Sequence, residues 1–336
     1  MNKRNKRKSN LRVSLLLLLL AAILLVSSSY AWFTANKTVT VSTLDVNVEA
    51  QNGLQISTNG TTWKSIISKT DITTGYTGSV NQLPEILTPV SSGKTIDTST
   101  GYLNMFLGDV ESNENGDYVL TATPSVEQAG TTGHFIAFDM FLKVATDTDI
   151  EMTTTSGVKT TDDKSKGIEN ASRIAFVVEG NVANGASAST IQELKAATPA
   201  TTYIWEPNFN IHTPAAISHA LDVYGITTTA DSATAVPYDG VIASIIKTEN
   251  IKVGDATAAK NGTKLATVTT DYQTKSGFDA NVQVFSLKAG ITKVRMYMWI
   301  EGQDVDCEDD ASGSNIAFDL QLTVKAVSYT HLRAHE

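Results

Sequence analysis

Cysteine is almost absent from this sequence of 336 residues, which contains only Cys307. A disulfide within the chain therefore cannot form, and the stability of the fold must come from packing. One thiol also cannot build a cysteine metal cluster, and no local motif supplies the histidine that a cysteine nucleophile needs. We interpret Cys307 as a structural residue.

The short motifs of common enzyme classes are missing as well. The sequence has no HExxH zinc motif, no GxSxG nucleophile motif, no glycine-rich phosphate loop and no paired-cysteine zinc motif. His134, His212 and His219 do not have the spacing of metal ligands. We therefore predict no catalytic residues and do not expect an enzyme.

Positive charge is scarce. The chain has 26 Lys and Arg against 35 Asp and Glu, which gives a net charge of −9. Residues 1–12 hold six of the basic residues and none of the acidic ones, so the rest of the chain is more acidic by those six charges. An acidic polypeptide repels nucleic acid and anionic lipid, and we predict neither as a partner.

One long apolar run is present, Val13–Val26, and it follows the basic residues. Small residues at Ser29 and Ala31 precede Trp32. A basic start, an apolar centre and a small-x-small site predict an export signal that is cut after Ala31, and therefore a secreted, extracellular or cell-surface protein. The alternative is that residues 13–33 stay as a membrane anchor, because about 20 residues cross a bilayer. Membrane contact is expected only through such an uncleaved leader.

The residues around this site, Ser28–Phe33, followed by the Thr-rich Thr34–Val41 and by Ser42–Val46, resemble a known family. They are similar to Gram-positive secreted proteins with a SipW-cognate signal peptide, which include the TasA and camelysin biofilm-matrix proteins. The resemblance covers about the first 48 residues. It implies processing by a SipW-type signal peptidase and a role in the matrix. The phrase Trp299–Cys307 resembles the C-terminal region of uncharacterised clostridial secreted proteins.

Threonine, serine, glycine and valine dominate the remaining sequence, which favours strands joined by turns. We predict an all-β fold, a jelly-roll-like β-sandwich with a less regular insertion that carries short helices. The strands predicted from their apolar patterns are Leu54–Thr58 and Trp63–Ile67 around an Asn59-Gly60 hairpin turn, Ile136–Val144, Arg173–Val178, Val282–Leu287, Val294–Ile300 and Ile316–Val324. Two short helices are expected, one from a capping box at Thr190 and one from Thr213 to Tyr224 before Gly225.

These features divide the chain into six parts. They are a signal peptide 1–31, an N-terminal arm or donor strand 32–43, the first part of the sandwich 44–180, an insertion or small lobe 181–275, the closing strands 276–326 and a non-native tail 327–336. The last part is set apart because the alternating pattern stops and the residues resemble a translated sequencing adaptor.

The apolar pattern changes register near the start of the sandwich. Val39 and Val41 are apolar at odd positions, whereas Leu44 and Val46 are apolar at even ones. Because a shift of one residue turns every side chain to the other face, one regular strand cannot bury both sets. Either a β-bulge lies near Thr43, or a detachable strand precedes the first strand of the domain.

The detachable strand would be a donor that completes the sheet of a neighbouring molecule. The side chains that it would insert are Trp32, Phe33, Val39 and Val41. The sequence then predicts a structural cell-surface or biofilm-matrix protein, a fibre subunit that associates with itself or with other matrix and surface proteins.

Two other functions remain open. A surface adhesin or glycan-binding module would stack sugars on Tyr203, Trp205 and Tyr238. A camelysin-like protease is the third interpretation, which only the resemblance implies.

An acidic run near the C-terminus is the one candidate metal site. Its candidate calcium ligands are Asp304, Asp306, Glu308 and Asp310. Ca²⁺ takes six to eight oxygen ligands and suits extracellular loops. The run departs from the EF-hand pattern, and a solvated acidic loop is the favoured interpretation. We therefore predict no cofactor, with Ca²⁺ as the only candidate ion.

Overall fold

The computed structural model describes residues 38–49, 53–113, 115, 118–161, 167–197, 200–249, 251–308 and 313–326. The predicted signal peptide, its cleavage residues Ser29 and Ala31, the aromatic pair Trp32 and Phe33, the acidic Asp310 and the tail 327–336 lie outside these residues. The described residues therefore do not test those predictions.

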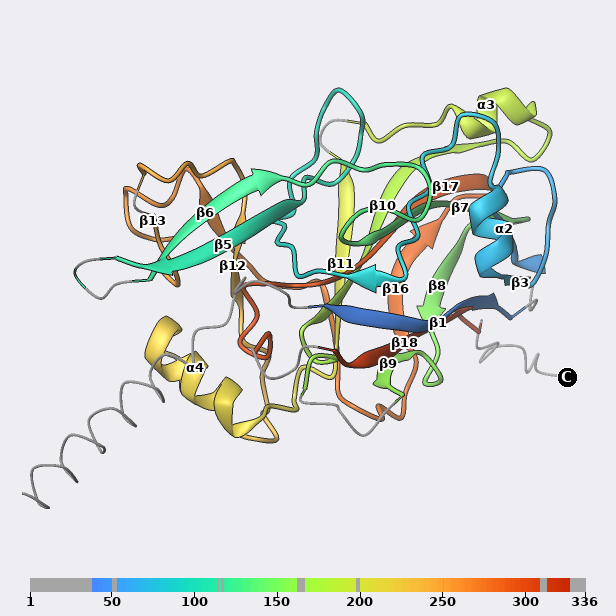
Figure 1. Cartoon of the computed structure of the whole chain (residues 1–336). Coiled ribbons are helices and arrows are strands. Elements are labelled where there is room, and N and C mark those ends of the chain that lie inside the picture. Colours follow the sequence, from blue (N-terminus) through green and yellow to red (C-terminus); the bar gives the residue numbers. More distant parts are fainter. Residues whose placement is uncertain are drawn as a thin grey trace, which may run out of the picture.

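Two packed β-sheets form the body of the molecule, which confirms the predicted all-β sandwich (Figure 1). The first sheet has seven strands in the order β16-β8-β18-β1-β3, with β4 paired to β1 and β9 paired to β18. Their bounds are β1 (Val39–Val48), β3 (Ile66–Ile67), β4 (Ile86–Leu87), β8 (Thr148–Met152), β9 (Gly157–Thr160), β16 (Val282–Leu287) and β18 (Asn315–Val324).

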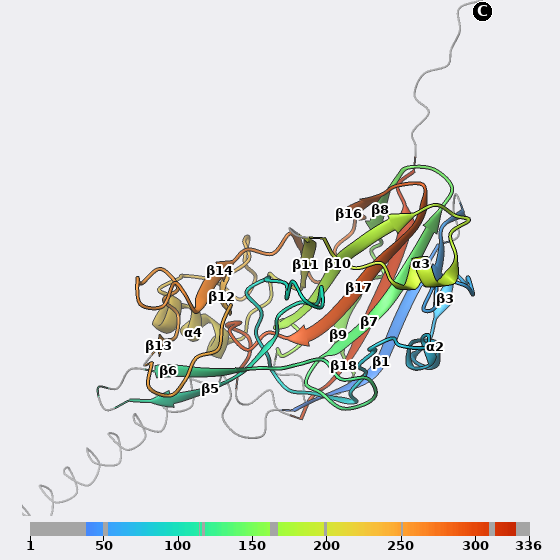
Figure 2. The same ribbon diagram turned by 90° about the horizontal axis from the view of Figure 1, so that it is seen from above.

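The second sheet has six strands in the order β15-β11-β10-β17-β7-β2. Their bounds are β2 (Gln55–Ser57), β7 (Ile136–Val144), β10 (Ser172–Val182), β11 (Thr201–Pro207), β15 (Tyr272–Thr274) and β17 (Gly290–Ile300). Figure 2 shows β10, β17 and β7 of this sheet lying in front of β1 and β18 of the first. The strands predicted at 136–144 and 282–287 match β7 and β16 residue for residue.

Alternating apolar side chains build the core between the sheets. On β17, Met296 and Met298 are buried in it, and on β18 Phe318 and Leu320 face them from the other sheet. Successive residues of a strand point to opposite faces, so a period of two in the sequence gives each sheet one apolar face. The predicted alternation therefore identifies the correct inner faces.

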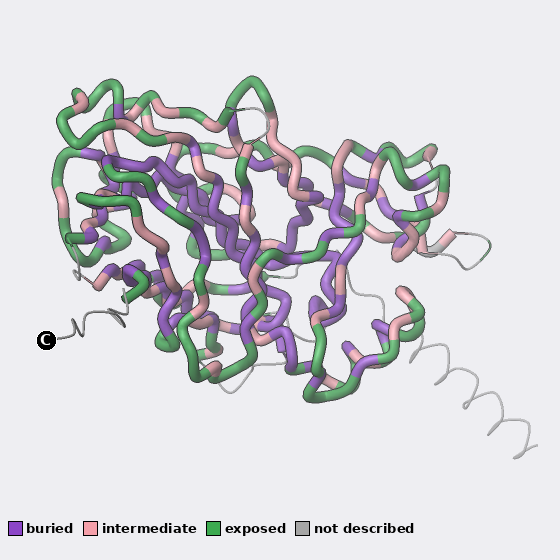
Figure 3. Tube along the Cα trace, turned by 180° about the vertical axis from the view of Figure 1, so that it is seen from behind, coloured by how far each residue is buried: buried purple, intermediate pink, exposed green. Residues whose placement is uncertain are grey.

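The second sheet is also covered on its outer face, which the alternation does not indicate. Every residue of β17 is buried, including Lys293, Arg295 and Tyr297, whose positions alternate with the core residues. A separate apolar cluster forms on this face, where Leu103 and Phe135 from covering segments pack against the sheet. Figure 3 shows the buried trace of these central strands enclosed by exposed segments.

Strand β1 resolves the register change near the N-terminus. It is one strand that pairs in parallel with β18 along most of its length, and the register shifts between Val41 and Thr43. The β-bulge near Thr43 is thus confirmed. The alternative is corrected: residues 39–43 do not form a separate arm, because Val39 and Thr40 also pair with β4 of the same sheet and Val39 is buried.

The predicted hairpin around Asn59-Gly60 is split between the two sheets. Ile56 and Lys64 form one antiparallel bridge, but β2 then pairs with β7 and β3 with β1. Gly60 has a φ of 74°, as the tight turn requires. A short helix, α2 (Lys69–Thr74), follows with a capping box of Ser68 and Asp71 that the sequence analysis missed.

A smaller lobe extends from one end of the sandwich (Figure 1). It contains two small sheets and a helix: β5 (Phe106–Ser112), β6 (Tyr118–Pro124) and β13 (Ile251–Lys252), then β12 (Tyr238–Val241) and β14 (Leu265–Val268), and α4 (Pro214–Tyr224). The segment 181–275 is therefore not simply an insertion, because it also supplies β11 and β15 to the second sheet.

Both predicted helices form. Helix α4 follows the predicted bounds, with Thr213 as N-cap and Gly225 as left-handed C-cap. Helix α3 (Ala188–Gln192) begins earlier than predicted because Ser187, and not Thr190, accepts the capping hydrogen bond.

Candidate functional site

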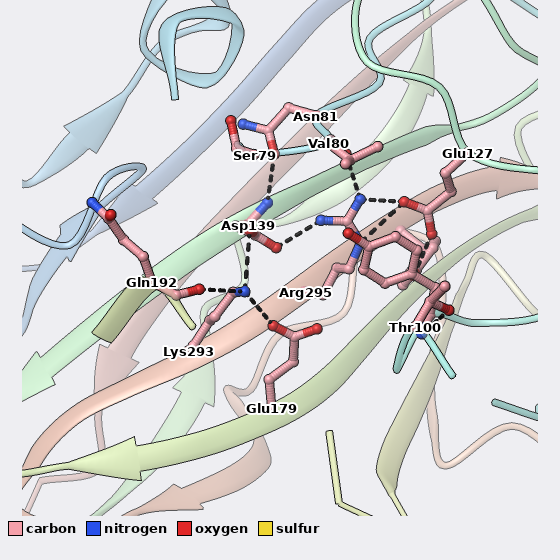
Figure 4. Close-up of polar contacts among 12 residues, drawn as sticks. Ser79, Val80, Asn81, Thr100, Glu127, Asp139, Glu179, Gln192, Lys293 and Arg295 are labelled. Atoms are coloured by element: carbon pink, nitrogen blue, oxygen red, sulfur yellow. Dashed lines mark hydrogen bonds and ion pairs between the residues drawn. The ribbon is translucent and has the colours of Figure 1, made fainter. Parts of the chain in front are cut away.

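Buried charges gather at two places on the outer face of the second sheet. Strand geometry places them there: Lys293 and Arg295 are two residues apart on β17, so both point away from the core. Asp139 lies directly opposite Arg295 on β7. Glu179 lies on β10, at a register shift between Val178 and Gly180. We call Glu127, Asp139, Glu179, Lys293 and Arg295 the lysine–carboxylate cluster (Figure 4).

Arg295 connects the sheet to the loops that cover it. Its guanidinium contacts Glu127 and donates from Nη1 to Asp139 Oδ1 at 2.6 Å. It also donates to the carbonyl of Val80 at 2.6 Å and lies 4.2 Å from the centre of the Tyr102 ring. These contacts satisfy a fully buried cation with hydrogen bonds and an aromatic face, which is what burial of a guanidinium requires.

Lys293 lies between two carboxylates. Its Nζ is 2.8 Å from Glu179 Oε2 and 3.3 Å from Asp139 Oδ2, and all three side chains are nearly inaccessible to solvent. The carbonyls of Gln192 and Leu194 each accept a further hydrogen bond from Nζ at 3.1 Å. Figure 4 shows Lys293 pointing toward Asp139 and Glu179, which come from the neighbouring strands on its two sides.

Burial sets the protonation of this cluster. It raises the pKa of Glu179 to about 7, and the nearby Asp139 charge acts in the same direction. Burial would also raise the pKa of Asp139, but Arg295 and Lys293 hold it below its usual value. Three carboxylates thus face two cations, and Glu179 is the one that retains a proton near neutrality.

The acidic run at 304–308 belongs to the second group of buried charges on this face. Asp304 contacts the guanidinium of Arg173, whose Nη2 is also 3.1 Å from Glu206 Oε1. Arg173 is fully buried and comes from β10, whereas Glu206 comes from β11. The run is therefore packed against the sheet, and its interpretation as a solvated loop is wrong.

Histidines pair with the next two carboxylates of the run. His212 Nδ1 is 2.8 Å from Asp306 Oδ2, and His219 Nδ1 is 2.8 Å from Glu308 Oε1. Burial raises the pKa of Asp306 to about 7, so the His212–Asp306 pair holds a shared proton near neutrality. His219 lies on α4, and its contact connects that helix to the acidic run.

Three of the predicted calcium ligands thus each contact a different side chain: Asp304 contacts Arg173, Asp306 contacts His212 and Glu308 contacts His219. Asp304, Asp306 and Glu308 each have a basic partner in the chain, and Asp310 lies outside the described residues. Within the residues that the structure describes, no group of three or more His, Cys, Asp or Glu is arranged to hold a metal ion. A calcium ion would have to compete with Arg173 and two histidines for these oxygens.

The aromatic residues proposed for sugar stacking are inside the protein. Trp205 and Tyr238 are each 1% exposed. Tyr203 is half-buried and packs on Tyr272 and Phe285, with ring centres 5.6 and 6.3 Å away. Trp205 and Tyr238 are therefore not available to stack on a sugar, and this part of the glycan interpretation is corrected.

A cleft of about 300 Å³ opens beside β9. Its lining includes Lys159 from β9 and Ser156 just before that strand, together with Asn208 and Phe278 from segments that follow strands of the second sheet. Asn208 has a φ of 56°, an uncommon value for a residue other than glycine. The cleft was not predicted, because its residues come from four separate parts of the sequence.

The sequence analysis also missed the lysine–carboxylate cluster. A weak signal was available: Asp139 interrupts the apolar strand 136–144 at its centre, and Lys293 and Arg295 alternate with apolar residues before Trp299. Charged residues at alternate positions normally face water, so the pattern alone favours an exposed face.

Comparison with family models, with curated proteins and with solved structures found no match. Among the helices of the described residues, none has the length and apolar character needed to cross a bilayer.

Proposed function

We propose that this protein is a secreted structural subunit of the bacterial cell surface or of an extracellular matrix, and that copies associate by exchanging strand β1. The leader at 1–31 and its resemblance to SipW-cognate signal peptides support export and processing by a signal peptidase of that type. The buried charges support a structural role, because the ion pairs of Arg295 and Arg173 connect covering segments to the sheet.

The placement of β1 carries the proposal of strand exchange. It is the first strand of the described chain, and eight of its residues pair in parallel with β18. On its other side, among the described residues, it pairs only with the two-residue strands β3 and β4. It fills the core with apolar side chains, including Leu44, Val46 and Val48. A terminal strand with one long partner can leave its own sheet and occupy the same position in another copy.

Such an exchange produces chains of molecules. If β1 of one copy completes the sheet of the next, the contact is head-to-tail, and a head-to-tail contact that does not close into a ring forms a filament. The same groove beside β18 and the same apolar side chains are used within one copy and between copies. The donor of this proposal is the strand 39–48, and not the arm 32–43 expected from the sequence.

A reversible lock on β1 tests the proposal in the full chain. Asn47 and Gln321 are register partners on β1 and β18. The double variant Asn47→Cys with Gln321→Cys should remain monomeric when oxidised, because the disulfide holds β1 in its own sheet, and should assemble when reduced. Electron microscopy and size-exclusion chromatography of the exported protein give the readout. The single variant Asn47→Cys is the matched control.

Two outcomes would reject strand exchange. One is an oxidised double variant that assembles as readily as the unmodified protein. The other is an unmodified exported protein that stays monomeric at every concentration measured. In either case a structural surface role would have to rest on the leader alone.

Glycan binding is the second candidate function, and the cleft beside β9 is the observation that favours it. A cavity of this size with hydroxyl, amide, lysine and aromatic groups has the chemistry of a saccharide subsite. A glycan array probed with the unmodified protein and with Phe278→Ala tests this function. Binding that the substitution abolishes would support it, and the absence of any bound glycan would reject it.

A further inference from the structure

We propose that Lys293 and Asp139 become joined by a covalent amide between Nζ of the lysine and the side-chain carboxyl carbon of the aspartate. Glu179 acts as the proton-transfer group, and one water molecule is released. The bond would connect β17 to β7 within one molecule. This modification is independent of strand exchange, because none of the three residues lies on β1 or β18.

Three adjacent strands bring the reacting groups together. Lys293 lies on the central strand β17, Asp139 on β7 and Glu179 on β10. The amine is 3.3 Å from an oxygen of the Asp139 carboxyl group and 2.8 Å from Glu179. Groups held at such separations by a rigid scaffold have lost the freedom that makes the same reaction slow between free molecules in water. The sheet therefore supplies the orientation.

A β-bulge aims Glu179 at the amine. The register between β10 and β17 shifts between Val178 and Gly180, which leaves Glu179 as the extra residue. Bulges of this kind redirect one side chain and are frequent beside active sites. Gly180 has a φ of 148°, and a Cβ there would come within 3.0 Å of Leu194, the residue whose carbonyl accepts a hydrogen bond from Lys293.

Exclusion of water favours the amide over the ion pair. Lys293, Asp139 and Glu179 have side chains no more than 7% exposed. In water the ammonium and carboxylate ions are well solvated and the amide is not favoured. In this site both ions have lost that solvation, and condensation replaces them with one neutral group. The released water leaves for bulk solvent, and water is then absent from the place where hydrolysis would occur.

Condensation also lowers the number of charges buried in the cluster and leaves its net charge unchanged. Before it, Lys293 and Arg295 face the carboxylates of Asp139 and Glu127 and the protonated Glu179. After it, Arg295 and Glu127 remain as a pair of opposite charges in direct contact. Glu179 is left protonated, and burial of this residue already favours its protonated form. A protonated Glu179 can donate a hydrogen bond to the new amide.

The reaction balances without any other reactant. Glu179 begins protonated. It gives its proton to the Asp139 carboxylate, which becomes a neutral carboxylic acid, and takes one from the Lys293 ammonium, which becomes a free amine. The free amine attacks the carboxyl carbon and forms the new C–N bond. Glu179 then transfers a second proton from the nitrogen to the departing hydroxyl, the C–O bond breaks and water leaves. One ammonium and one carboxylate are consumed, and Glu179 ends as it began.

Two hydrogen-bond donors already contact the carboxyl oxygens of Asp139. Arg295 Nη1 is 2.6 Å from Oδ1, and the Tyr76 hydroxyl is 2.6 Å from Oδ2. Negative charge grows on one of these oxygens when the amine adds to the carbon. Donors fixed in a dry site stabilise such charge without rearranging. Arg295 and Tyr76 are therefore positioning and stabilising residues for this step.

Mass spectrometry of the full purified chain tests the proposal directly. The chain should be about 18 Da lighter than its processed sequence, the mass of one water molecule. After trypsin digestion, a branched peptide should join residues 95–143 to residues 289–295, with no cleavage after Lys293 because its amine is acylated. A chain of full mass, with separate peptides ending at Lys143 and at Lys293, would overturn the proposal.

The same digest contains an internal control. Lys288 and Asp147 form an ion pair at 2.7 Å, closer than Lys293 and Asp139, but both side chains are more than half exposed. This pair should remain unlinked, because it is in water. Equal linkage at Lys288 and Asp147 would overturn the argument that burial and the third carboxyl drive the reaction.

Two variants separate the roles of the residues. Lys293→Arg keeps a positive charge but has no amine of the same reactivity, so the variant should have its full mass. Glu179→Gln keeps the shape of the side chain but cannot carry protons, and should lose most of the cross-linked product. If the Lys293→Arg chain were still about 18 Da lighter than its sequence, the mass loss would come from other residues and the proposed bond would be rejected. Full linkage in Glu179→Gln would overturn the role of Glu179.

Discussion

Buried cations connect individual covering segments to the outer face of the second sheet. Arg295 binds Glu127 and the carbonyl of Val80, and Lys293 binds the carbonyls of Gln192 and Leu194. A buried ion pair adds little net stability over apolar packing, because both ions lose their hydration. Its effect is on specificity, since a displaced loop would leave a charge buried without a partner.

Arg173 allows a test of this effect. Arg173→Met keeps much of the side-chain volume but leaves Glu206 and Asp304 buried without their cation, and should lower the unfolding free energy by about 3–5 kcal/mol. Lys247→Met is the control, because Lys247 pairs with Glu111 at the surface and its loss should cost less than about 1 kcal/mol. Urea unfolding measures both. Equal losses would contradict the role given to Arg173.

For single residues, the sequence indicates which face of the sheet a side chain occupies but not whether that face is buried. The alternation in 136–144 and 294–300 correctly turns Asp139 and Arg295 away from the core. The same alternation wrongly predicts that both side chains face water, because a period of two does not show whether the outer face is covered. The covering segments that bury them, such as those with Leu103 and Phe135, have no regular pattern in the sequence.

Among the elements, β1 depends on one extra residue. The bulge lets Val39 be buried before it and Leu44 after it, although their positions differ in parity. At the bulge, the Ser42 hydroxyl donates a hydrogen bond to the carbonyl of Ile316 at 2.9 Å. The sequence predicted this bulge as one of two readings, and only the pairing with β18 and β4 distinguishes them.

Deleting Ser42 should cost little stability. Without the extra residue Val39 and Leu44 have the same parity, so both still face the core, and only the hydrogen bond of Ser42 to the carbonyl of Ile316 is lost. Val39→Ala is the comparison variant, because it keeps the bulge and removes most of a buried side chain, whose burial is worth about 1.5–3 kcal/mol. Chemical denaturation should show the larger loss for Val39→Ala. A larger loss for the deletion would contradict this account of the bulge.

The acidic run 304–308 gives a second prediction for an element. Its carboxylates already contact Arg173, His212 and His219, so calcium should bind weakly if at all. Millimolar CaCl₂ should leave the melting temperature where an equal ionic strength of NaCl leaves it. A rise seen with calcium alone would show that the run, with Asp310, binds the ion in spite of these partners.

Elements with strong local signals were predictable, and those defined by distant partners were not. The residues of α4 follow from Pro214 at its start and Gly225 at its end. In contrast, β15 has three residues and pairs in parallel with β11, which lies far back in the sequence. No local pattern identifies such a strand, so the segment 181–275 was read as an insertion.

For the whole molecule, buried carboxyl groups determine how stability depends on pH. Burial raises the pKa values of Glu179, Glu301 and Asp306 to about 7. A carboxyl group with a raised pKa binds its proton more tightly in the folded chain than in the unfolded one. The folded chain therefore holds more protons between about pH 4 and pH 7, and the unfolding free energy must fall as the pH rises through this range.

This dependence can be measured by urea unfolding at pH 5 and pH 7.5. The unfolding free energy should be lower at pH 7.5 by at least about 1 kcal/mol, roughly the effect of one pKa unit on one group. Asp71, whose pKa is lowered to about 2 mainly by Lys64, changes protonation below this range and does not oppose the trend. Glu301→Gln should make the dependence less steep, and an unchanged slope would assign it to other groups.

The parallel pairing of β1 and β18 has a mechanical consequence. Because the two strands run in the same direction, Val39 and Val324 lie at opposite ends of the pair. Tension applied through the residues before β1 and after β18 would slide one strand along the other, and would load the hydrogen bonds of the pair together instead of opening them one by one. A protein held at these two points would resist stretching far better than one in which the same strands were antiparallel.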